Sequence, residues 1–263
     1  MLADSHCHLD WFSGPAAIVA NAQKAGVEKI LSNATSMASI GKNLALSSEF
    51  KEVKCALGIH PVDLLPMKRA EIDSAFRLVE ENISSCVAIG EVGMDFKRAS
   101  MPVQRELQEE VFRKFISLAI THDKPVVVHS RWAESQCLSI LEEMGCQKVH
   151  MHWFTSSAKN ARRAVRLGYR ISCGPIILSD ALSAQIVKGI PLESLLLETD
   201  APVEFGGGRS EPSWIPRVCA AVSAIKGVSA GEVSQATGRN FSALYGLSNP
   251  AIFHGASGNE TAR

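Results

Sequence analysis

The chain has 263 residues, of which 46% are hydrophobic, so it carries enough apolar material for one large folded domain, and global disorder is excluded. Lys plus Arg and Asp plus Glu each number 27, and this balance gives no overall basic footprint for nucleic acid, although it does not exclude a local basic rim. No stretch approaches the ~20 apolar residues that span a bilayer.

Eight short runs rich in Val, Ile and Leu recur along the chain. They are mostly continuous rather than alternating, which is typical of strands buried on both faces. The predicted strands are Met1–His6, Val27–Asn33, Val53–Ile59, Cys86–Glu91, Pro125–His129, Lys148–His152, Tyr169–Cys173 and Leu195–Asp200.

Segments with helical spacing separate these runs, and several are followed by glycine, as helix ends commonly are. Strands that alternate with helices predict an α/β fold, a TIM-like (β/α)8 barrel with extra C-terminal helices. The predicted helices are Pro15–Lys24, Gln104–Thr121, Ala133–Met144, Ser157–Leu167, Ala181–Lys188, Ile215–Ile225 and Ala230–Tyr245.

The end of the chain differs in composition from the part before it. A glycine-rich stretch, Phe205–Ser210, predicts a flexible loop after the eighth strand. We expect a single hydrolase barrel over residues 1–250 and a poorly ordered polar tail over 251–263. Seven scattered cysteines without a Cys-x-x-Cys motif favour a reducing compartment, and no signal peptide is apparent, so we expect a cytoplasmic protein.

Several predicted strands end in His, Asp or Glu, the residue types that bind metal ions. The carboxyl ends of parallel barrel strands open at one face, so these side chains are expected to meet there. His6 and His8 are two residues apart and point the same way on a strand. Of His150 and His152, the latter lies at the end of its run and is the better candidate, while His150 is expected to pack beneath the rim with a hydrogen bond. The candidate ligands are His6, His8, Glu91, His129, His152 and Asp200.

Six nitrogen and oxygen ligands exceed the four of a structural zinc site and suit two divalent ions that share the carboxylate of Glu91. Two such ions lower the pKa of a water and stabilise charge on a phosphoryl oxygen, which is hydrolytic chemistry without a protein nucleophile. Asp200 and Glu91 are the candidate catalytic acids, with Asp200 as proton acceptor. The sequence predicts one or two ions per chain, Zn, Mg or Mn, without deciding among them.

Three further polar residues lie near the same rim. His60 follows the third run and is a candidate for substrate contact or proton transfer, with a plain loop anchor as the alternative. Arg131 follows His129 and is suited to binding an anionic oxygen such as that of a phosphate, although an ordinary loop salt bridge is the alternative. Glu198 either belongs to the site or orients a neighbouring ligand or loop.

Taken together and in order, these motifs resemble the TatD family of metal-dependent deoxyribonucleases, and the resemblance runs to about Leu247. It implies a TIM-like barrel in which the six candidate ligands hold one or two divalent ions and His60 lies at the substrate site. Family members include nucleases that trim DNA ends. The matching stretches include Asp4-Ser5-His6-Cys7-His8, Gly58-Ile59-His60-Pro61, Gly90-Glu91-Val92-Gly93-Met94-Asp95, His129-Ser130-Arg131 and Glu198-Thr199-Asp200-Ala201-Pro202.

The sequence departs from the family pattern at positions expected to line the substrate rim. Trp132-Ala133 stands where an acidic residue often follows His-Ser-Arg, and Val203 replaces the usual aromatic residue after Asp-Ala-Pro. The ligand set is intact, so these departures concern substrate preference rather than metal binding.

We therefore predict a metal-dependent phosphodiester hydrolase with DNA as substrate, no membrane association and no obligate protein partner. One alternative is an amidohydrolase or lactonase that uses the same metal core on a small uncharged substrate. A second alternative is a barrel retained as a metal-binding or interaction protein without turnover.

Overall fold

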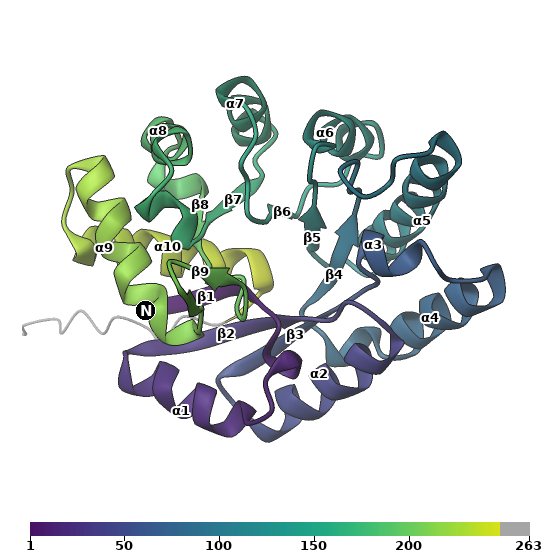
Figure 1. The fold of residues 1–263 in the computed structure, drawn as a ribbon, viewed down its shortest axis with the longest axis horizontal. Helices are drawn as coiled ribbons and strands as arrows, with labels where there is room; N and C mark the ends of the chain where they lie inside the picture. Colours follow the sequence, from purple (N-terminus) through teal and green to yellow (C-terminus); the bar gives the residue numbers. More distant parts are fainter. Residues whose placement is uncertain (248–263) are drawn as a thin grey trace, which may run out of the picture.

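A computed structural model describes residues 1–247, and its eight central strands form one parallel sheet in sequence order, curved into a barrel with helices outside (Figure 1). The predicted (β/α)8 fold is confirmed. The strands are β1 Leu2–Cys7, β2 Val27–Asn33, β3 Val53–Leu57, β4 Ala88–Gly93, β5 Val126–His129, β6 Val149–Met151, β7 Arg170–Cys173 and β8 Leu195–Leu197.

The first and last strands meet just beyond the carboxyl end of β8. Cys7 and Ala201 form a parallel bridge, and the backbone N–H of His8 donates to the carbonyl of Ala201 at 2.7 Å. The N–H of Asp200 also donates to the carbonyl of His6 at 2.9 Å. The barrel is therefore joined at the end where the candidate ligands lie.

Ten α-helices surround and cap the sheet within residues 1–247, and five short 3-10 helices lie in the connections. The α-helices are α1 Pro15–Lys24, α2 Met37–Glu49, α3 Pro61–Leu64, α4 Arg69–Glu81, α5 Pro102–Thr121, α6 Glu134–Glu143, α7 Ala158–Arg166, α8 Ala181–Gly189, α9 Ile215–Lys226 and α10 Ala230–Tyr245. The 3-10 helices are Leu9–Trp11, Ile83–Ser85, Pro175–Leu178, Leu192–Ser194 and Pro212–Trp214.

The structure differs from the sequence-based prediction in local details. The stretch expected to be only a flexible loop after the eighth strand contains a short antiparallel hairpin, β9 Glu204–Phe205 with β10 Gly208–Arg209. The third, sixth and eighth strands end earlier than predicted, at Leu57, Met151 and Leu197. The predicted tail, residues 251–263, and the end of the predicted domain lie outside the described residues.

Small and aliphatic side chains fill the interior of the barrel at the amino-terminal end of its strands. Phe241 and Tyr245 of α10 pack against them and close this end. The side chain of Asn240 on the same helix donates to the carbonyl of Leu195, where β8 begins. The opposite end is left free for a site. The interior residues are Ala3, Leu31, Ala56, Ala88, Val127 and Leu196.

Among the helices of residues 1–247, none combines the length and the apolar character needed to cross a bilayer.

Candidate metal centre

The structure brings all six predicted ligands together at the carboxyl ends of the strands. His6 lies in β1 and His8 directly follows it, Glu91 lies in β4, and His129 ends β5. His152 directly follows β6. Asp200 lies three residues beyond β8, in the segment joined to β1.

Four ligand atoms form a first donor group. The Nε2 atoms of His6 and His8 lie 3.4 and 3.5 Å from Glu91 Oε2, respectively, and 3.5 and 3.4 Å from Asp200 Oδ1. Ligands held about 2.1 Å from a tetrahedral ion lie about 3.4 Å from one another. The group therefore has the spacing of a divalent metal site.

A second donor group faces the other oxygen of the same carboxylate. Glu91 Oε1 lies 2.8 Å from His129 Nδ1 and 2.8 Å from His152 Nε2, and these two nitrogens are 3.4 Å apart. The two oxygens of Glu91 thus point at two different groups of ligands. This is the arrangement of a carboxylate that bridges two ions.

The chemistry of the donors fits a cation. Within residues 1–247, both ring nitrogens of His6 and Glu91 Oε2 are buried without a hydrogen-bond partner, although buried polar atoms are normally satisfied. Burial raises the pKa of Glu91, but the imidazoles around it outweigh burial and hold this pKa well below its usual range. The contact with His8 likewise outweighs burial and lowers the pKa of Asp200. Two ionised carboxylates therefore face the buried imidazoles.

Residues outside the donor groups fix which ring nitrogen His129 and His8 present. His129 Nε2 lies 3.1 Å from Asp95 Oδ2, so it donates there and leaves Nδ1 free toward Glu91. His8 Nδ1 donates to the carbonyl of Asn33 at 2.9 Å, which leaves Nε2 free. The sequence motif that contains Asp95 did not predict its contact with His129.

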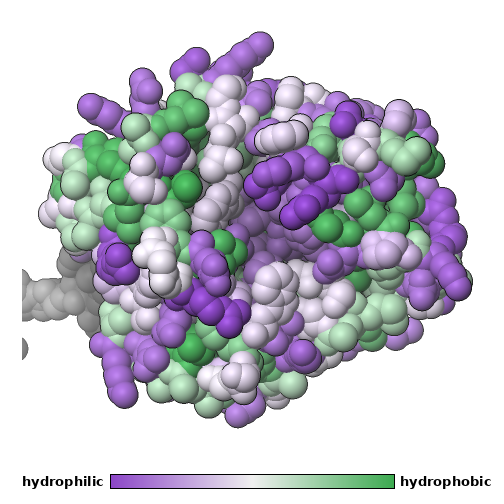
Figure 2. Space-filling view, viewed as in Figure 1, coloured by the Kyte–Doolittle hydropathy of each residue, from purple (hydrophilic) through white to green (hydrophobic). Residues whose placement is uncertain are grey.

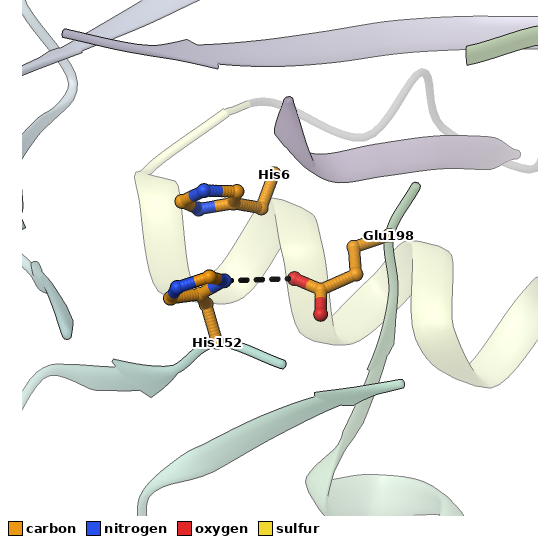
Figure 3. Close-up of side chains that lie close together, drawn as sticks. All are labelled: His6, His152 and Glu198. Carbon is orange, nitrogen blue, oxygen red and sulfur yellow. Dashed lines mark ion pairs between the residues drawn. The ribbon is translucent and has the colours of Figure 1, made fainter. Parts of the chain in front are cut away.

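Glu198 lies beside the two donor groups, and its carboxylate, His6 and His152 are close enough together to hold a metal ion themselves. Figure 3 shows the His6 and His152 rings stacked, with centroids 3.8 Å apart, and Glu198 beside His152. Glu198 Oε2 lies 3.7 Å from His152 Nδ1, and its oxygens accept hydrogen bonds from the Trp153 N–H and the Ser172 hydroxyl. This fully buried carboxylate therefore holds the turn after His152 and lies within ion-pair distance of the His152 ring.

Asp4 connects the first strand to the segment that carries Asp200. Its side chain is fully buried, and it accepts hydrogen bonds from the hydroxyl and the backbone N–H of Thr199 at 2.5 and 3.0 Å. Burial raises the pKa of Asp4 to about 8. Asp200 itself has a left-handed backbone (φ 48°), which is rare for a non-glycine residue and is held here by this contact network.

His60 approaches the second donor group from another direction. Its Nδ1 accepts the backbone N–H of Val62, so the neutral ring carries its proton on Nε2. Burial lowers the pKa of His60 to about 3, which keeps the ring neutral. Nε2 lies 3.2 Å from His129 Nδ1 and 3.6 Å from Glu91 Oε1. His60 therefore presents an N–H donor to the cluster.

A cleft lies over the donor groups and appears as a hydrophilic hollow near the centre of Figure 2. It comprises two adjoining cavities of about 420 and 310 Å³, and Arg131 lines both. Arg98 lines the smaller one. Neither guanidinium has an ion-pair partner among residues 1–247. The cleft thus combines buried acidic ligands with free cationic side chains above them.

His150 lies outside both donor groups. It is fully buried in β6, and its Nδ1 is 2.8 Å from the hydroxyl of Tyr245 in α10. The expectation that His150 packs beneath the rim with a hydrogen bond is confirmed.

Comparisons with known proteins show which family the chain belongs to. The sequence-family model described as TatD related DNase matches residues 3–246. The human deoxyribonuclease TATDN3 is 34% identical over 259 residues, covering 93% of this chain and 94% of its own length. YabD of Bacillus subtilis, described as an uncharacterised metal-dependent hydrolase, is 32% identical over 256 residues, covering 93% and 99%.

Among solved structures, the TatD homologue YjjV from Escherichia coli superposes with a TM-score of 0.86 at 30% identity, covering 94% of this chain and 98% of its own. The resemblance inferred from the sequence motifs is thereby confirmed. The chain belongs to the family of TatD-related DNases.

Proposed function

We propose that this protein is a metal-dependent phosphodiesterase that acts on DNA. The observation that carries the proposal is the carboxylate of Glu91, whose two oxygens face two separate donor groups beneath a cleft lined by free arginines. Membership of a family of metal-dependent hydrolases and the deoxyribonuclease name of the human relative support it.

In this proposal the candidate ligands divide between two ions. His6, His8 and Asp200 would hold one ion with Glu91 Oε2, and His129 and His152 would hold the other with Oε1. When bound, the ions would activate a water for attack and stabilise charge on the phosphoryl oxygen. Four imidazoles favour zinc or a similar transition ion over magnesium.

Asp200 is the proposed proton acceptor. Its side chain is 17% exposed and lines both cavities, whereas Glu91 is 2% exposed and enclosed by imidazoles. The lowered pKa of Asp200 keeps it ionised and able to take a proton from the attacking water. Asp200 is therefore the ionised candidate ligand whose carboxylate is most exposed to the cleft.

Two side chains are proposed to hold the phosphate. The Nε2–H of His60 is aimed at the donor cluster and would donate a hydrogen bond to a phosphoryl oxygen. Arg131, with no ion-pair partner among the described residues, would supply a bidentate contact from the side of the cleft. The neutral His60 would orient the phosphate through one directional hydrogen bond, and Arg131 would compensate its negative charge.

Substrate class is tested by comparing phosphodiesters with uncharged substrates. Metal-free protein is reloaded separately with Zn, Mn and Mg and assayed on end-labelled DNA, methyl p-nitrophenyl phosphate, lactones and p-nitroanilides. We expect metal-dependent cleavage of the phosphodiesters. Cleavage of a lactone or amide without any phosphodiester cleavage would overturn the proposal in favour of an amidohydrolase or lactonase.

The role of Glu91 is tested by Glu91→Ala. The substitution removes one ligand from each donor group, so we expect phosphodiester hydrolysis to fall by more than ~100-fold. The barrel stays folded, because β4 keeps its backbone pairing with β3 and β5. Initial rates, metal content and circular dichroism check this. Normal turnover in the folded variant would remove Glu91 from the mechanism.

A further inference from the structure

Trp132 is a large apolar side chain left open beside the cleft. It keeps 68% of its surface exposed, and it directly follows Arg131, which lines both cavities. Its backbone is left-handed (φ 58°), which is unusual for so bulky a residue. Packing in the core does not explain a strained, exposed tryptophan at this position. We therefore interpret the ring as a contact surface for a bound ligand.

The segment after β4 contacts both the backbone beside Trp132 and the Trp132 ring. The backbone N–H of Phe96, in the segment after β4, donates to the carbonyl of Arg131 at 2.9 Å. Lys97, next in that segment, places its Nζ 5.7 Å from the ring centroid of Trp132, over the ring face. The ring is therefore supported by a cation while most of its surface stays open.

The chemistry beside the ring suits a nucleotide. Arg98 and Arg131 line the cleft without ion-pair partners among residues 1–247, and both are suited to binding a phosphate. A nucleobase is a flat ring attached near a phosphate, and bases stack on exposed aromatic side chains regardless of base identity. A ring next to a phosphate-binding arginine is the arrangement that such a ligand needs.

We propose that Trp132 is a specificity-determining residue on which a nucleobase of the substrate stacks while Arg131 holds the adjacent phosphate. This inference rests on the proposed phosphodiesterase function and deepens it, because it assigns to the protein a preference for base-bearing over base-free phosphodiesters.

Trp11 lines the smaller cavity and has a different role from Trp132. It is 52% exposed, but its ring stacks on the imidazole of His8, with centroids 4.5 Å apart and an interplanar angle of 17°. Removing it would disturb a candidate metal ligand. Trp132 makes no such contact with a donor residue, so its truncation separates base recognition from metal binding.

The test compares two substrates that share a leaving group, thymidine 5′-(p-nitrophenyl) phosphate and methyl p-nitrophenyl phosphate. For Trp132→Ala we expect kcat/KM on the thymidine substrate to fall by about 5- to 100-fold, mainly through KM. The methyl substrate should be hydrolysed as before. Trp132→Phe should restore most of the loss, because it keeps an aromatic face.

A matched control is Met101→Ala, which removes an exposed apolar side chain (57% exposed) outside the residues that line the cleft. It should change neither substrate. A second readout is binding of oligothymidylate to the metal-free protein, which should weaken in Trp132→Ala and persist in Trp132→Phe.

The outcomes separate the two proposals. If the unsubstituted protein hydrolyses neither phosphodiester, the proposed function fails. If it hydrolyses both and Trp132→Ala changes them equally or not at all, base stacking on Trp132 is refuted while the phosphodiesterase function stands. A loss confined to the thymidine substrate, together with weaker oligothymidylate binding, supports the inference.

Discussion

At the scale of single residues, the candidate ligands His129 and His8 each depend on a neighbour that sets the protonation and orientation of the ring. Asp95 is the clearest case, since its Oδ2 lies 3.1 Å from His129 Nε2 while its Oδ1 accepts the backbone N–H of Arg98. The hydrogen bond from Arg98 orients the Asp95 carboxylate, and the carboxylate in turn orients the His129 ring. Such outer contacts commonly contribute 10- to 100-fold, roughly, in metal affinity.

We therefore expect Asp95→Ala to weaken metal binding by ~10- to 100-fold, because His129 Nδ1 is no longer the preferred free nitrogen. Competition with a chelator of known affinity measures the change. Asp95→Asn is the control, because its side-chain oxygen still accepts from the imidazole, and it should lose less. Equal affinity in Asp95→Ala and the unsubstituted protein would remove Asp95 from the support of the site.

In contrast to Asp95, His150 is a buried histidine next to the site whose contacts stabilise the fold rather than a candidate ligand. Its hydrogen bond to the Tyr245 hydroxyl connects β6 to α10. We expect His150→Ala to lower the free energy of unfolding by roughly 1–3 kcal/mol, since it leaves the hydroxyl of Tyr245 buried without this partner. The rate of hydrolysis should stay within about twofold of normal, because His150 is in neither donor group.

Urea unfolding of His150→Ala, Tyr245→Phe and the double variant measures the pair. Because one hydrogen bond joins the two side chains, the double variant should cost less than the sum of the single variants. A fully stable but inactive His150→Ala would show that this histidine takes part in the chemistry after all.

The sequence predicted the candidate ligands better than their surroundings. His129 and Glu91 could be found because a polar residue at the end of an apolar run emerges at a known face of a barrel. Asp95 could not, because its contact depends on how the segment after β4 folds back over β5. The protonation of His60 likewise depends on a backbone N–H two residues away.

At the scale of elements, periodicity predicted all eight central strands but misplaced several ends. His152 and Asp200 continue apolar runs, yet they lie past the ends of β6 and β8, where the chain turns into the cleft. The helix Met37–Glu49 (α2) was not predicted. Neither was α4, although its Ile72, Ala75 and Val79 are buried at helical spacing.

The hydrophobic periodicity of the sequence predicts the helix α10 but does not show that this helix closes the barrel interior. Its sequence predicts an ordinary amphipathic helix, but its Phe241 is 1% exposed and packs into the barrel interior beside Leu31 and Leu196. These residues come from strands at opposite ends of the chain. The helix therefore completes the core at the end remote from the metal centre.

We expect Phe241→Ala to lower the free energy of unfolding by about 3–5 kcal/mol, because it leaves a cavity where the interior is closed. Phe241→Leu should cost less. Chemical denaturation with a constant m-value checks both, and the metal affinity of the folded fraction should be unchanged. A loss below about 1 kcal/mol would mean that the interior does not depend on this side chain.

At the scale of the whole molecule, the metal centre connects parts of the chain that are distant in sequence. Its donors come from β1, β4 and β5 and from the segments after β6 and β8. The same segment after β8 carries the bridge between Cys7 and Ala201 that joins the two ends of the sheet. Ions bound to these donors would therefore stabilise the closed barrel as well as the site.

This coupling predicts a metal-dependent stability. Binding to the folded state alone adds about 2.7 kcal/mol at a free metal concentration 100 times Kd, which corresponds to roughly 5–10 °C in Tm for a domain of this size. Thermal unfolding followed by circular dichroism, with and without a chelator and after reloading with zinc, measures the shift.

The unsubstituted protein should gain this stability on reloading, and Glu91→Ala should gain less than half of it, because each donor group has lost one atom. Met101→Ala should behave like the unsubstituted protein, since its side chain lies outside the cleft. An identical Tm with and without metal, in protein shown to bind it, would mean that the ions do not hold the barrel together. The metal ions would then have a role in hydrolysis but none in stabilising the barrel.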